Sequence, residues 1–367
     1  MASTVVIIGG GLAGLTTAFR LCGRYRVVLL EAAPRLGGQI HTELCDGFVI
    51  ERGAEGFVAR SQALPALVAD LGMPEGELIG QSTLRSYGYD GRQLLALQPG
   101  EAASFLGFQV PPEDLGKGIR SLRRGMASLV WALSGNLRER ADVRLQTRVE
   151  RVLQTAGGVR VELAHGPAVE ADAAVVATNA AAASALLQPV AGELARALSA
   201  ASTLSSVTVE LVYPRAAVAH ALDGTGFVVS QAAQRDGLRA CTFTTSKFVD
   251  RAPPGHVSLR AFFRPAAGEA AVLPAPLAAP PLDDAAWRAR AVAGIGRVLA
   301  LQGEPLRAFV SRWPDALPVF DNAHTQRVAA LEAALAGRPV LLAGAAFHGA
   351  GIDAAVRSGE RAAAALR

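Results

Sequence analysis

The feature that most constrains this chain is a glycine-rich turn between a short apolar strand and a helical stretch near the N-terminus. Residues 5–8 read Val-Val-Ile-Ile, residues 9–14 read Gly-Gly-Gly-Leu-Ala-Gly, and a second apolar run at 27–30 ends at Glu31. This order of strand, glycine turn, helix, strand and acid is typical of a βαβ unit that binds a dinucleotide pyrophosphate at the helix N-terminus. The sequence therefore predicts a parallel sheet with a dinucleotide at its carboxyl edge.

Each residue type in this unit has an expected task. Gly9 permits the tight turn, Gly11 lets backbone approach the pyrophosphate, and Gly14 lets the helix pack closely on the strand. Glu31 is expected to accept hydrogen bonds from the adenosine ribose. The predicted contacts of this first segment are Gly9, Gly10, Gly11, Leu12, Ala13, Gly14, Glu31 and Ala32.

A second signature lies near the C-terminus. Residues 340–344 read Val-Leu-Leu-Ala-Gly, and residues 349–352, Gly-Ala-Gly-Ile, open another helical stretch. A helix start offers backbone N–H groups and a positive dipole end to a phosphate or to the pyrimidine of a reduced flavin. Signatures at both ends of the chain predict a long dinucleotide that crosses the fold, as FAD does, with contacts at Gly344, Gly351 and Ile352.

The stretch after Glu31 favours FAD over NAD. Residues 35–39 read Arg-Leu-Gly-Gly-Gln, so that the segment resembles the E-x-x-x-R-x-G-G extension of the FAD-dependent amine oxidase superfamily. Arg35 could pair with a phosphate as a fork donor, while Gly37 and Gly38 let the chain pass against the cofactor. Gln39 completes this set of predicted contacts. The simpler explanation of Arg35 is a solvated surface charge.

Most of the chain then resembles the oxygen-dependent porphyrinogen oxidases of haem biosynthesis, which act on protoporphyrinogen or coproporphyrinogen. Blocks in the first fifty-seven residues are shared across the superfamily, and later blocks are more particular to porphyrinogen oxidases. The blocks that carry the resemblance are residues 9–38, 47–57, 121–129, 240–248, 251–253, 259–260, 312–314 and 343–360.

The resemblance implies positions and chemistry. The loop of Gly53, Ala54, Glu55 and Gly56 would lie near the isoalloxazine, the Val149 backbone near the adenine, and Trp313 beside the flavin. The reaction would take a tetrapyrrole porphyrinogen to the porphyrin by hydride transfer to flavin N5, with O2 as the acceptor. The cofactor carries this chemistry, so little is required of an acid–base side chain. The sequence assigns no catalytic residue and no metal ligand.

The implied fold is α/β, with two domains in an FAD-dependent amine-oxidase-like arrangement. A Rossmann-type FAD domain would comprise residues 1–56, 125–180 and 308–367, and a mixed-sheet substrate domain residues 57–124 and 181–307. Local patterns add a helix, a hairpin and three antiparallel strands, expected at 64–71, 86–97, and 143–145 with 149–153 and 159–163.

One departure from the family concerns the membrane. Relatives carry a long helical insertion, which contacts the membrane and helps enclose the substrate, between the early hairpin and the block at 121–129. Only residues 98–120 stand in its place here. We therefore expect a more open substrate pocket and at most peripheral membrane contact.

Composition narrows the partners and the compartment. The net charge is +4, and nearly all of the positive charge is carried by arginines. These arginines are scattered and have no interleaved aromatic residues, so nucleic-acid binding is not predicted. The first strand starts almost at Met1, leaving no room for a signal peptide, and three cysteines show no metal or redox spacing. These observations predict a cytoplasmic protein; they say nothing of its oligomeric state.

Two side chains are candidates for substrate contact. Arg60, near the expected flavin loop, could pair with a propionate, and His348, beside the C-terminal glycines, could face the flavin. A surface arginine and a structural hydrogen bond are the plainer explanations. Two other functions stay open: an FAD oxidase of an amine or another bulky substrate, and a flavin-binding paralogue without turnover.

Overall fold

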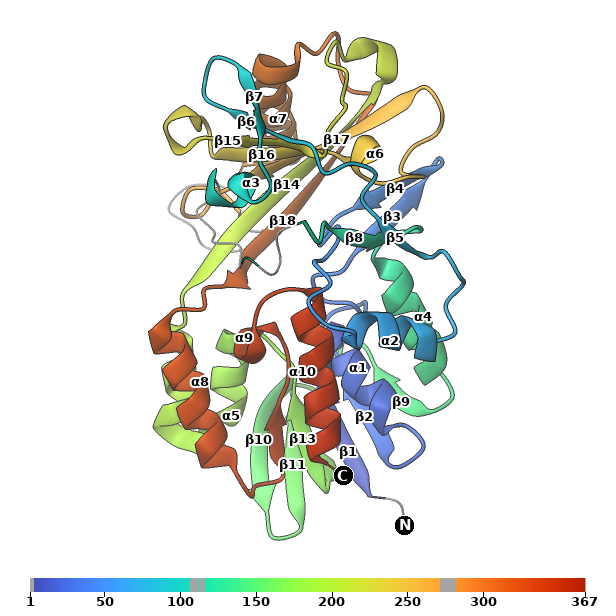
Figure 1. Ribbon diagram of the computed structural model, residues 1–367. Helices are drawn as coiled ribbons and strands as arrows, with labels where there is room; N and C mark the ends of the chain where they lie inside the picture. Colours follow the sequence, from blue (N-terminus) through green and yellow to red (C-terminus); the bar gives the residue numbers. More distant parts are fainter. Residues whose placement is uncertain (1–2, 106–111, 113–115, 271–281, 367) are drawn as a thin grey trace.

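A five-stranded parallel sheet forms the centre of one lobe of the molecule, drawn lowest in Figure 1 and called here the parallel-sheet lobe. The structure is a computed structural model that describes residues 3–105, 112, 116–270 and 282–366. The strands, in spatial order, are β19 (Val340–Leu342), β13 (Ala173–Val176), β1 (Thr4–Ile8), β2 (Arg26–Leu30) and β9 (Ala141–Arg144).

Both faces of this sheet are buried, as its continuous apolar strands require. Val5 and Ile7 pack toward one face of the sheet, while Val6 and Ile8 pack toward the other. The first face is covered by α1 (Leu12–Leu21), α2 (Ala63–Asp70), α4 (Ala127–Leu137) and α10 (Ile352–Ala365). The second is covered by α5 (Ala180–Ala197), α8 (Asn322–Leu335) and the antiparallel strands β10 (Val149–Thr155), β11 (Gly158–Leu163) and β12 (Val169–Ala171).

Glycines set the entry into α1. Gly9 has φ +109°, and a Cβ there would lie 2.6 Å from the Ala177 carbonyl oxygen. A Cβ on Gly14 would lie 2.0 Å from the carbonyl oxygen of Gly9. No other residue fits either position, because each backbone passes directly against another. The turn and the close helix–strand packing are those that the motif predicts.

A seven-stranded mixed sheet forms the second lobe, called here the mixed-sheet lobe (Figure 1). Its strands, in order, are β18 (Arg307–Pro318), β14 (Thr203–Pro214), β17 (His256–Phe263), β16 (Leu238–Phe243), β15 (Gly226–Val229), β6 (Ser86–Tyr89) and β7 (Leu94–Leu97). Only the β15–β6 pair is parallel. Helix α7 (Asp284–Leu299) covers one face, where the fully buried Trp287 packs on Phe263 with 5.3 Å between ring centroids.

Two long strands, β14 and β18, run from the mixed-sheet lobe toward the parallel-sheet lobe (Figure 1). Short elements complete the fold: the hairpin β3 (Thr42–Cys45) and β4 (Phe48–Glu51), the pair β5 (Leu78–Gly80) and β8 (Arg120–Leu122), and the helices α3 (Glu101–Phe105), α6 (Thr244–Lys247) and α9 (Ala345–His348). In the part of the chain described here, no helix has both the length and the apolar character needed to cross a bilayer.

Three elements lie on the other side of the expected domain boundaries. The apolar faces of α2 and α5 share the two cores of the parallel sheet, through Leu67 and Leu187 respectively. Strand β18, in contrast, pairs with β14 over most of its length. Packing explains these positions. The apolar faces of the parallel sheet are covered by α2 and α5, and the edge of β14 is covered by β18. We therefore propose boundaries that place α2 and α5 in the parallel-sheet lobe and β18 in the mixed-sheet lobe.

Most of the helices and strands predicted from local patterns are confirmed, and one strand is not. The helix α2 and the β6–β7 hairpin form where they were expected. Strands β10 and β11 are antiparallel, with Val152 opposite Val161. The prediction that the strand at 143–145 joins them is wrong, because β9 runs parallel to β2 in the five-stranded sheet. The crossover between those two strands includes α4, as parallel pairing requires.

Candidate functional site

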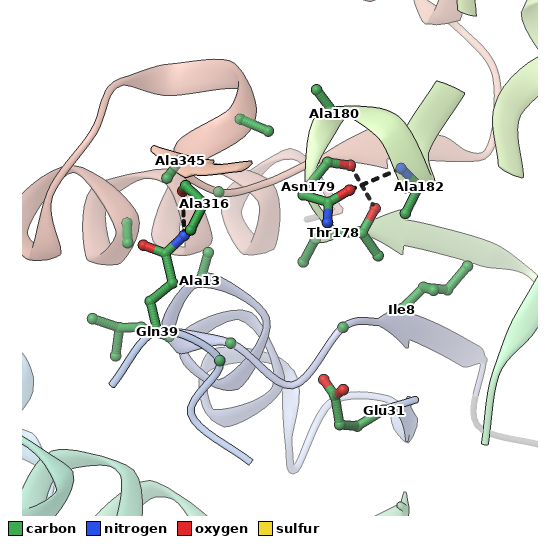
Figure 2. Close-up of a pocket in the computed structure, with 18 of the residues that line it drawn as sticks. Ile8, Ala13, Glu31, Gln39, Thr178, Asn179, Ala180, Ala182, Ala316 and Ala345 are labelled. Carbon is green, nitrogen blue, oxygen red and sulfur yellow. Dashed lines mark hydrogen bonds between the residues drawn. The ribbon is translucent and has the colours of Figure 1, made fainter. Parts of the chain in front are cut away.

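A cavity of about 530 Å³ opens at the carboxyl ends of the parallel strands (Figure 2). Its wall is made largely of backbone and small side chains from both ends of the chain. Fourteen of the predicted FAD contacts line it: Gly9, Gly11, Leu12, Ala13, Glu31, Ala32, Gly37, Gly38, Gln39, Ala54, Val149, Gly344, Gly351 and Ile352. The topology thus brings together segments that lie more than three hundred residues apart, and we call this space the dinucleotide cavity.

Helix starts meet at the dinucleotide cavity. Gly11 precedes α1, Asn179 precedes α5 and Gly351 precedes α10, and all three residues line the cavity. No acidic residue lies in the first turn of α1 or α5. The free N–H groups and positive dipole ends at these positions favour a bound anion such as a pyrophosphate.

Glu31 is held in place before any ligand arrives. Its carboxylate accepts hydrogen bonds from the backbone N–H of Gly10 at 2.6 Å and of Ala33 at 2.7 Å. Figure 2 draws this carboxylate among the lining residues, at the end of β2. Each carboxylate oxygen has further acceptor capacity, so the group is placed to bind ribose hydroxyls.

Gly11 provides a steric test of the fit to a dinucleotide. A Cβ on Gly11 would meet no protein atom within 4 Å, although the residue lines the cavity. A side chain at this position would therefore project into the cavity instead of into the protein. The backbone of Gly11 is extended, a conformation that any residue can adopt. Glycine is therefore needed here because it leaves the cavity open, and not because of its backbone conformation.

Arg35, which was expected to pair with a phosphate, instead contacts the backbone of its own loop. Its guanidinium donates to the carbonyl oxygens of Leu36 at 3.1 Å, Ile40 at 3.0 Å and Gly38 at 2.7 Å. Arg35 is not among the residues that line the dinucleotide cavity. Burial lowers the pKa of this guanidinium. These contacts brace the loop that carries Gly37 and Gly38, and the loop, not the arginine, reaches the cavity.

The Gly53–Gly56 loop lies between the two lobes, and of its residues only Ala54 lines the dinucleotide cavity. A Cβ on Gly53 would lie 1.9 Å from the Gln39 carbonyl oxygen, and one on Gly56 would lie 2.6 Å from that of Arg120. Trp313 donates its indole N–H to the Arg52 carbonyl oxygen at 2.8 Å. These residues therefore fix the loop against both lobes.

The Glu55 side chain points into a buried ionic cluster. Its carboxylate accepts a hydrogen bond from the Lys247 ammonium and lies 3.5 Å from the Arg260 guanidinium. Burial alone would raise the pKa of Glu55, but the charges of Lys247 and Arg260 outweigh burial and lower it. Arg260 also donates to the Gly53 carbonyl oxygen at 2.5 Å. The mixed sheet thereby anchors the loop through charged contacts that the sequence did not predict.

A second cavity of about 370 Å³ is lined mainly by residues of the mixed sheet, and we call it the sheet cavity. Neighbouring residues on the two long strands line different spaces: Thr203 and Ala316 line the dinucleotide cavity, while Leu204 and Leu317 line the sheet cavity. The lining is mostly apolar and aromatic. Its charged members are Arg239, Lys247 and Arg264, and no acidic residue is among the described residues that line it.

The two candidate substrate contacts lie outside both of these cavities. Arg60 is exposed and lines neither. The imidazole of His348 is 2.6 Å from the Ser358 hydroxyl and 2.8 Å from the Glu332 carboxylate. Burial and the charge of Arg361 lower its pKa to about 4. His348 thus makes the structural hydrogen bonds of the plainer explanation, joining α8 and α10.

Comparison with known families shows which cofactor the chain uses. A family model described as flavin containing amine oxidoreductase matches residues 85–367, and one described as an NAD(P)-binding Rossmann-like domain matches residues 7–71. The chain belongs to the flavin-containing amine oxidoreductase family. It is an FAD-dependent oxidoreductase, and the expected α/β fold with a Rossmann-type domain and a mixed sheet is confirmed.

Individual relatives share this architecture. The chain is 25% identical to coproporphyrinogen III oxidase of Bacillus subtilis, over 98% of this chain and 96% of the relative. It is 31% identical to coproporphyrinogen III oxidase of Propionibacterium freudenreichii, over 64% of this chain and 42% of the relative. The Bacillus alignment spans 465 positions against 367 residues here, so that relative has roughly a hundred residues that this chain lacks.

Solved structures agree on the fold. A protein from Exiguobacterium sp. 255-15, provisionally named protoporphyrinogen oxidase, superposes with a TM-score of 0.82 at 23% identity, covering 100% of this chain and 99% of that one. Putrescine oxidase bound to putrescine superposes with a TM-score of 0.70 at 16% identity, covering 100% and 99%. These similarities concern the fold alone.

Proposed function

We propose that this flavoenzyme oxidises a porphyrinogen, coproporphyrinogen III or protoporphyrinogen IX, to the corresponding porphyrin. The observation that carries the proposal is the sheet cavity, which is apolar and cationic, and whose Thr242 and Lys247 contact Glu55, the neighbour of Ala54 in the dinucleotide cavity. A porphyrinogen is a large apolar macrocycle with carboxylate side chains, so its chemistry complements both properties. The names of the curated relatives support the same reading.

In this proposal the cofactor carries out the chemistry, and the residues of the chain bind and orient the cofactor and the substrate. FAD, when bound, supplies a hydride acceptor at N5 and is reoxidised by O2. The residues of the chain bind and orient: helix starts and Glu31 hold the dinucleotide, and the Gly53–Gly56 loop separates it from the ionic cluster of Glu55. Phe262, among the residues that line the sheet cavity, would keep water from part of the substrate surface. No acid–base residue is assigned.

An amine substrate is the second candidate, because putrescine oxidase shares the fold. The charge of the sheet cavity argues against it. An amine is protonated at neutral pH, and the described lining offers Arg239, Lys247 and Arg264 but no carboxylate to receive it. A cationic substrate would therefore meet repulsion where an anionic one meets attraction.

The compartment and the size of the enclosure form part of the same proposal. We place the reaction in the cytoplasm, with at most peripheral membrane contact. The roughly one hundred residues that the Bacillus relative has in addition leave a smaller enclosure in this chain. Access for a large macrocycle is easier in such an open site.

The test is enzyme-dependent porphyrin formation in air. FAD-loaded protein is mixed separately with coproporphyrinogen III and protoporphyrinogen IX, and porphyrin fluorescence is followed beside an enzyme-free control for auto-oxidation. We expect a rate above the control with at least one of them. An amine panel with peroxide detection runs in parallel. Peroxide from an amine without porphyrin formation would support the second candidate, and neither product would support a paralogue without turnover.

A further inference from the structure

We propose that Lys247 is a positioning residue that links the two cavities. Through its ion pair with Glu55, it holds the Gly53–Gly56 loop, and with it Ala54, in the alignment that bound FAD needs for reduction by the substrate. The inference rests on the proposed function for the identity of the substrate, whereas the place of the loop against the flavin is open to a test without any substrate. Lys247 was not among the site residues predicted from the sequence.

Lys247 belongs to the wall of the sheet cavity. It ends α6, the short helix that directly follows β16, and it is 6% exposed. Its backbone carbonyl oxygen accepts a hydrogen bond from the Ser82 N–H at 2.8 Å, and its ammonium lies 5.3 Å from the centroid of the Phe248 ring. Both ends of the residue are thus held by the fold, so the ammonium has a defined position.

Glu55 carries this contact to the cofactor side. It follows Ala54, whose backbone N–H donates to the Gln39 carbonyl oxygen at 3.2 Å, and both Ala54 and Gln39 line the dinucleotide cavity. Consecutive Cα atoms are about 3.8 Å apart, so a shift of Glu55 also displaces Ala54. The Glu55 side chain therefore ties the wall of one cavity to the wall of the other.

Lys247 differs from the other cation beside Glu55. Arg260 lies 3.5 Å from the carboxylate and also donates to the Gly53 carbonyl oxygen, but it lines neither cavity. The Thr242 hydroxyl shares the wall of the sheet cavity and is 3.4 Å from the same carboxylate, but it is uncharged. Since the side chains of Lys247 and Glu55 are only 7% and 13% exposed, solvent screens their attraction little. Lys247 is therefore the charged link between the cavities.

The test removes this ion pair without leaving an unpaired carboxylate. The Lys247–Glu55 variant carries Lys247→Met and Glu55→Gln together, because Lys247→Met alone deprives a buried carboxylate of its partner and lowers stability. The double exchange leaves the net charge of the protein unchanged. The matched control carries Arg290→Met and Glu269→Gln, the same kind of exchange at a partly buried ion pair of 2.8 Å in the mixed-sheet lobe, whose residues line neither cavity.

The first readout needs no substrate. Visible circular dichroism of the bound FAD reports how the protein surrounds the isoalloxazine, and it is recorded on wild type and both variants saturated with FAD. We expect an altered spectrum in the Lys247–Glu55 variant and the wild-type spectrum in the control. A wild-type spectrum in the Lys247–Glu55 variant would overturn the inference, as would the same alteration in the control.

The second readout separates alignment from binding. Holoprotein is mixed anaerobically with increasing coproporphyrinogen III, or protoporphyrinogen IX, and flavin bleaching gives the limiting rate of reduction and the substrate dissociation constant. We expect the rate to fall at least about tenfold in the Lys247–Glu55 variant, since a small misplacement of reacting groups slows a reaction strongly. The dissociation constant should stay within about twofold, because the net charge is unchanged. A wild-type rate would overturn the inference.

Failure of the proposed function has a different signature. Wild type whose flavin is reduced by neither porphyrinogen would reject the proposed function. An altered circular dichroism spectrum confined to the Lys247–Glu55 variant would then still support the inference that Lys247 positions the loop against the flavin.

Discussion

The two cavities of this molecule are built in different ways. The dinucleotide cavity is formed by glycines, alanines and helix starts, which bind through backbone. The sheet cavity is lined by residues of paired strands, among them three cations and three phenylalanines. The first arrangement suits a cofactor that many proteins share, and the second suits one substrate class. Backbone geometry therefore selects the cofactor, whereas the side chains of the sheet cavity select the substrate.

The largest effect should come from filling the backbone-built cavity. Gly11→Val places a branched side chain in open space at a position whose extended backbone accepts valine. We expect FAD affinity to fall at least about a hundredfold while the protein stays folded. Gly135→Ala is the control, since its Cβ also meets no atom but lies on an exposed turn of α4. FAD titration by fluorescence quenching measures both; normal affinity in Gly11→Val would show that the cofactor lies elsewhere.

The sheet cavity should respond to loss of its buried ion pair. Lys247→Met leaves the buried Glu55 carboxylate with Arg260, at 3.5 Å, as its remaining ion-pair partner, so we expect the free energy of unfolding to fall by about 3 to 5 kcal/mol. Adding Glu55→Gln should restore part of that loss, because the carboxylate that lost its lysine partner is then neutral. Urea denaturation of the two single variants and the double variant gives the coupling free energy. Simple additivity would show that the pair does not stabilise the fold.

A smaller effect concerns Glu210, which is buried in the mixed sheet. Burial raises its pKa to about 7 from an ordinary 4.5, although Arg260 and the Ser258 hydroxyl favour the charged form. Between these values the folded protein keeps a proton that the unfolded chain has lost. Stability should therefore decrease as pH rises from about 5 to 7, by about 3 kcal/mol relative to Glu210→Gln. Parallel stability–pH curves for wild type and variant would contradict this.

The smallest effect is expected at His348, on the dinucleotide side. Its pKa of about 4 lies below the ordinary 6.5, so the folded state holds the neutral ring while the unfolded chain takes up a proton. Stability should be lost as pH falls from about 6.5 to 4. The Tm of wild type should fall by a few degrees more than that of His348→Gln over this range. An identical acid dependence of Tm in both proteins would remove His348 from the account of acid stability.

The contrast between the cavities also explains what the sequence could predict. The dinucleotide cavity depends on short motifs such as residues 9–14, whose spacing specifies backbone geometry, and so fourteen of its thirty-two lining residues were predicted. The sheet cavity depends on which strands pair, and Arg239, Lys247 and Arg264 carry no local signal of their common surface.

Predictions about individual polar side chains were less accurate for the same reason. Arg35 and His348 stand beside cofactor motifs in the sequence, but each finds partners close by: three carbonyl oxygens for Arg35, and Ser358 and Glu332 for His348. A long side chain can point in several directions, and the choice depends on the surrounding fold. Proximity in sequence to a motif therefore predicts a position better than it predicts a contact.

The most direct test of porphyrinogen oxidation is reduction of the flavin without oxygen. FAD-loaded protein is mixed anaerobically with excess coproporphyrinogen III, and separately with excess protoporphyrinogen IX, and the visible absorption of the oxidised flavin is followed beside porphyrin fluorescence. We expect the flavin to bleach in the mixture with its substrate, because a single two-electron step reduces it. Porphyrin formation needs three such steps, so it should exceed the enzyme-free rate only when admitted air reoxidises the flavin. A flavin that stays oxidised in both mixtures, while porphyrin forms only at the enzyme-free rate after air is admitted, would contradict the proposed function.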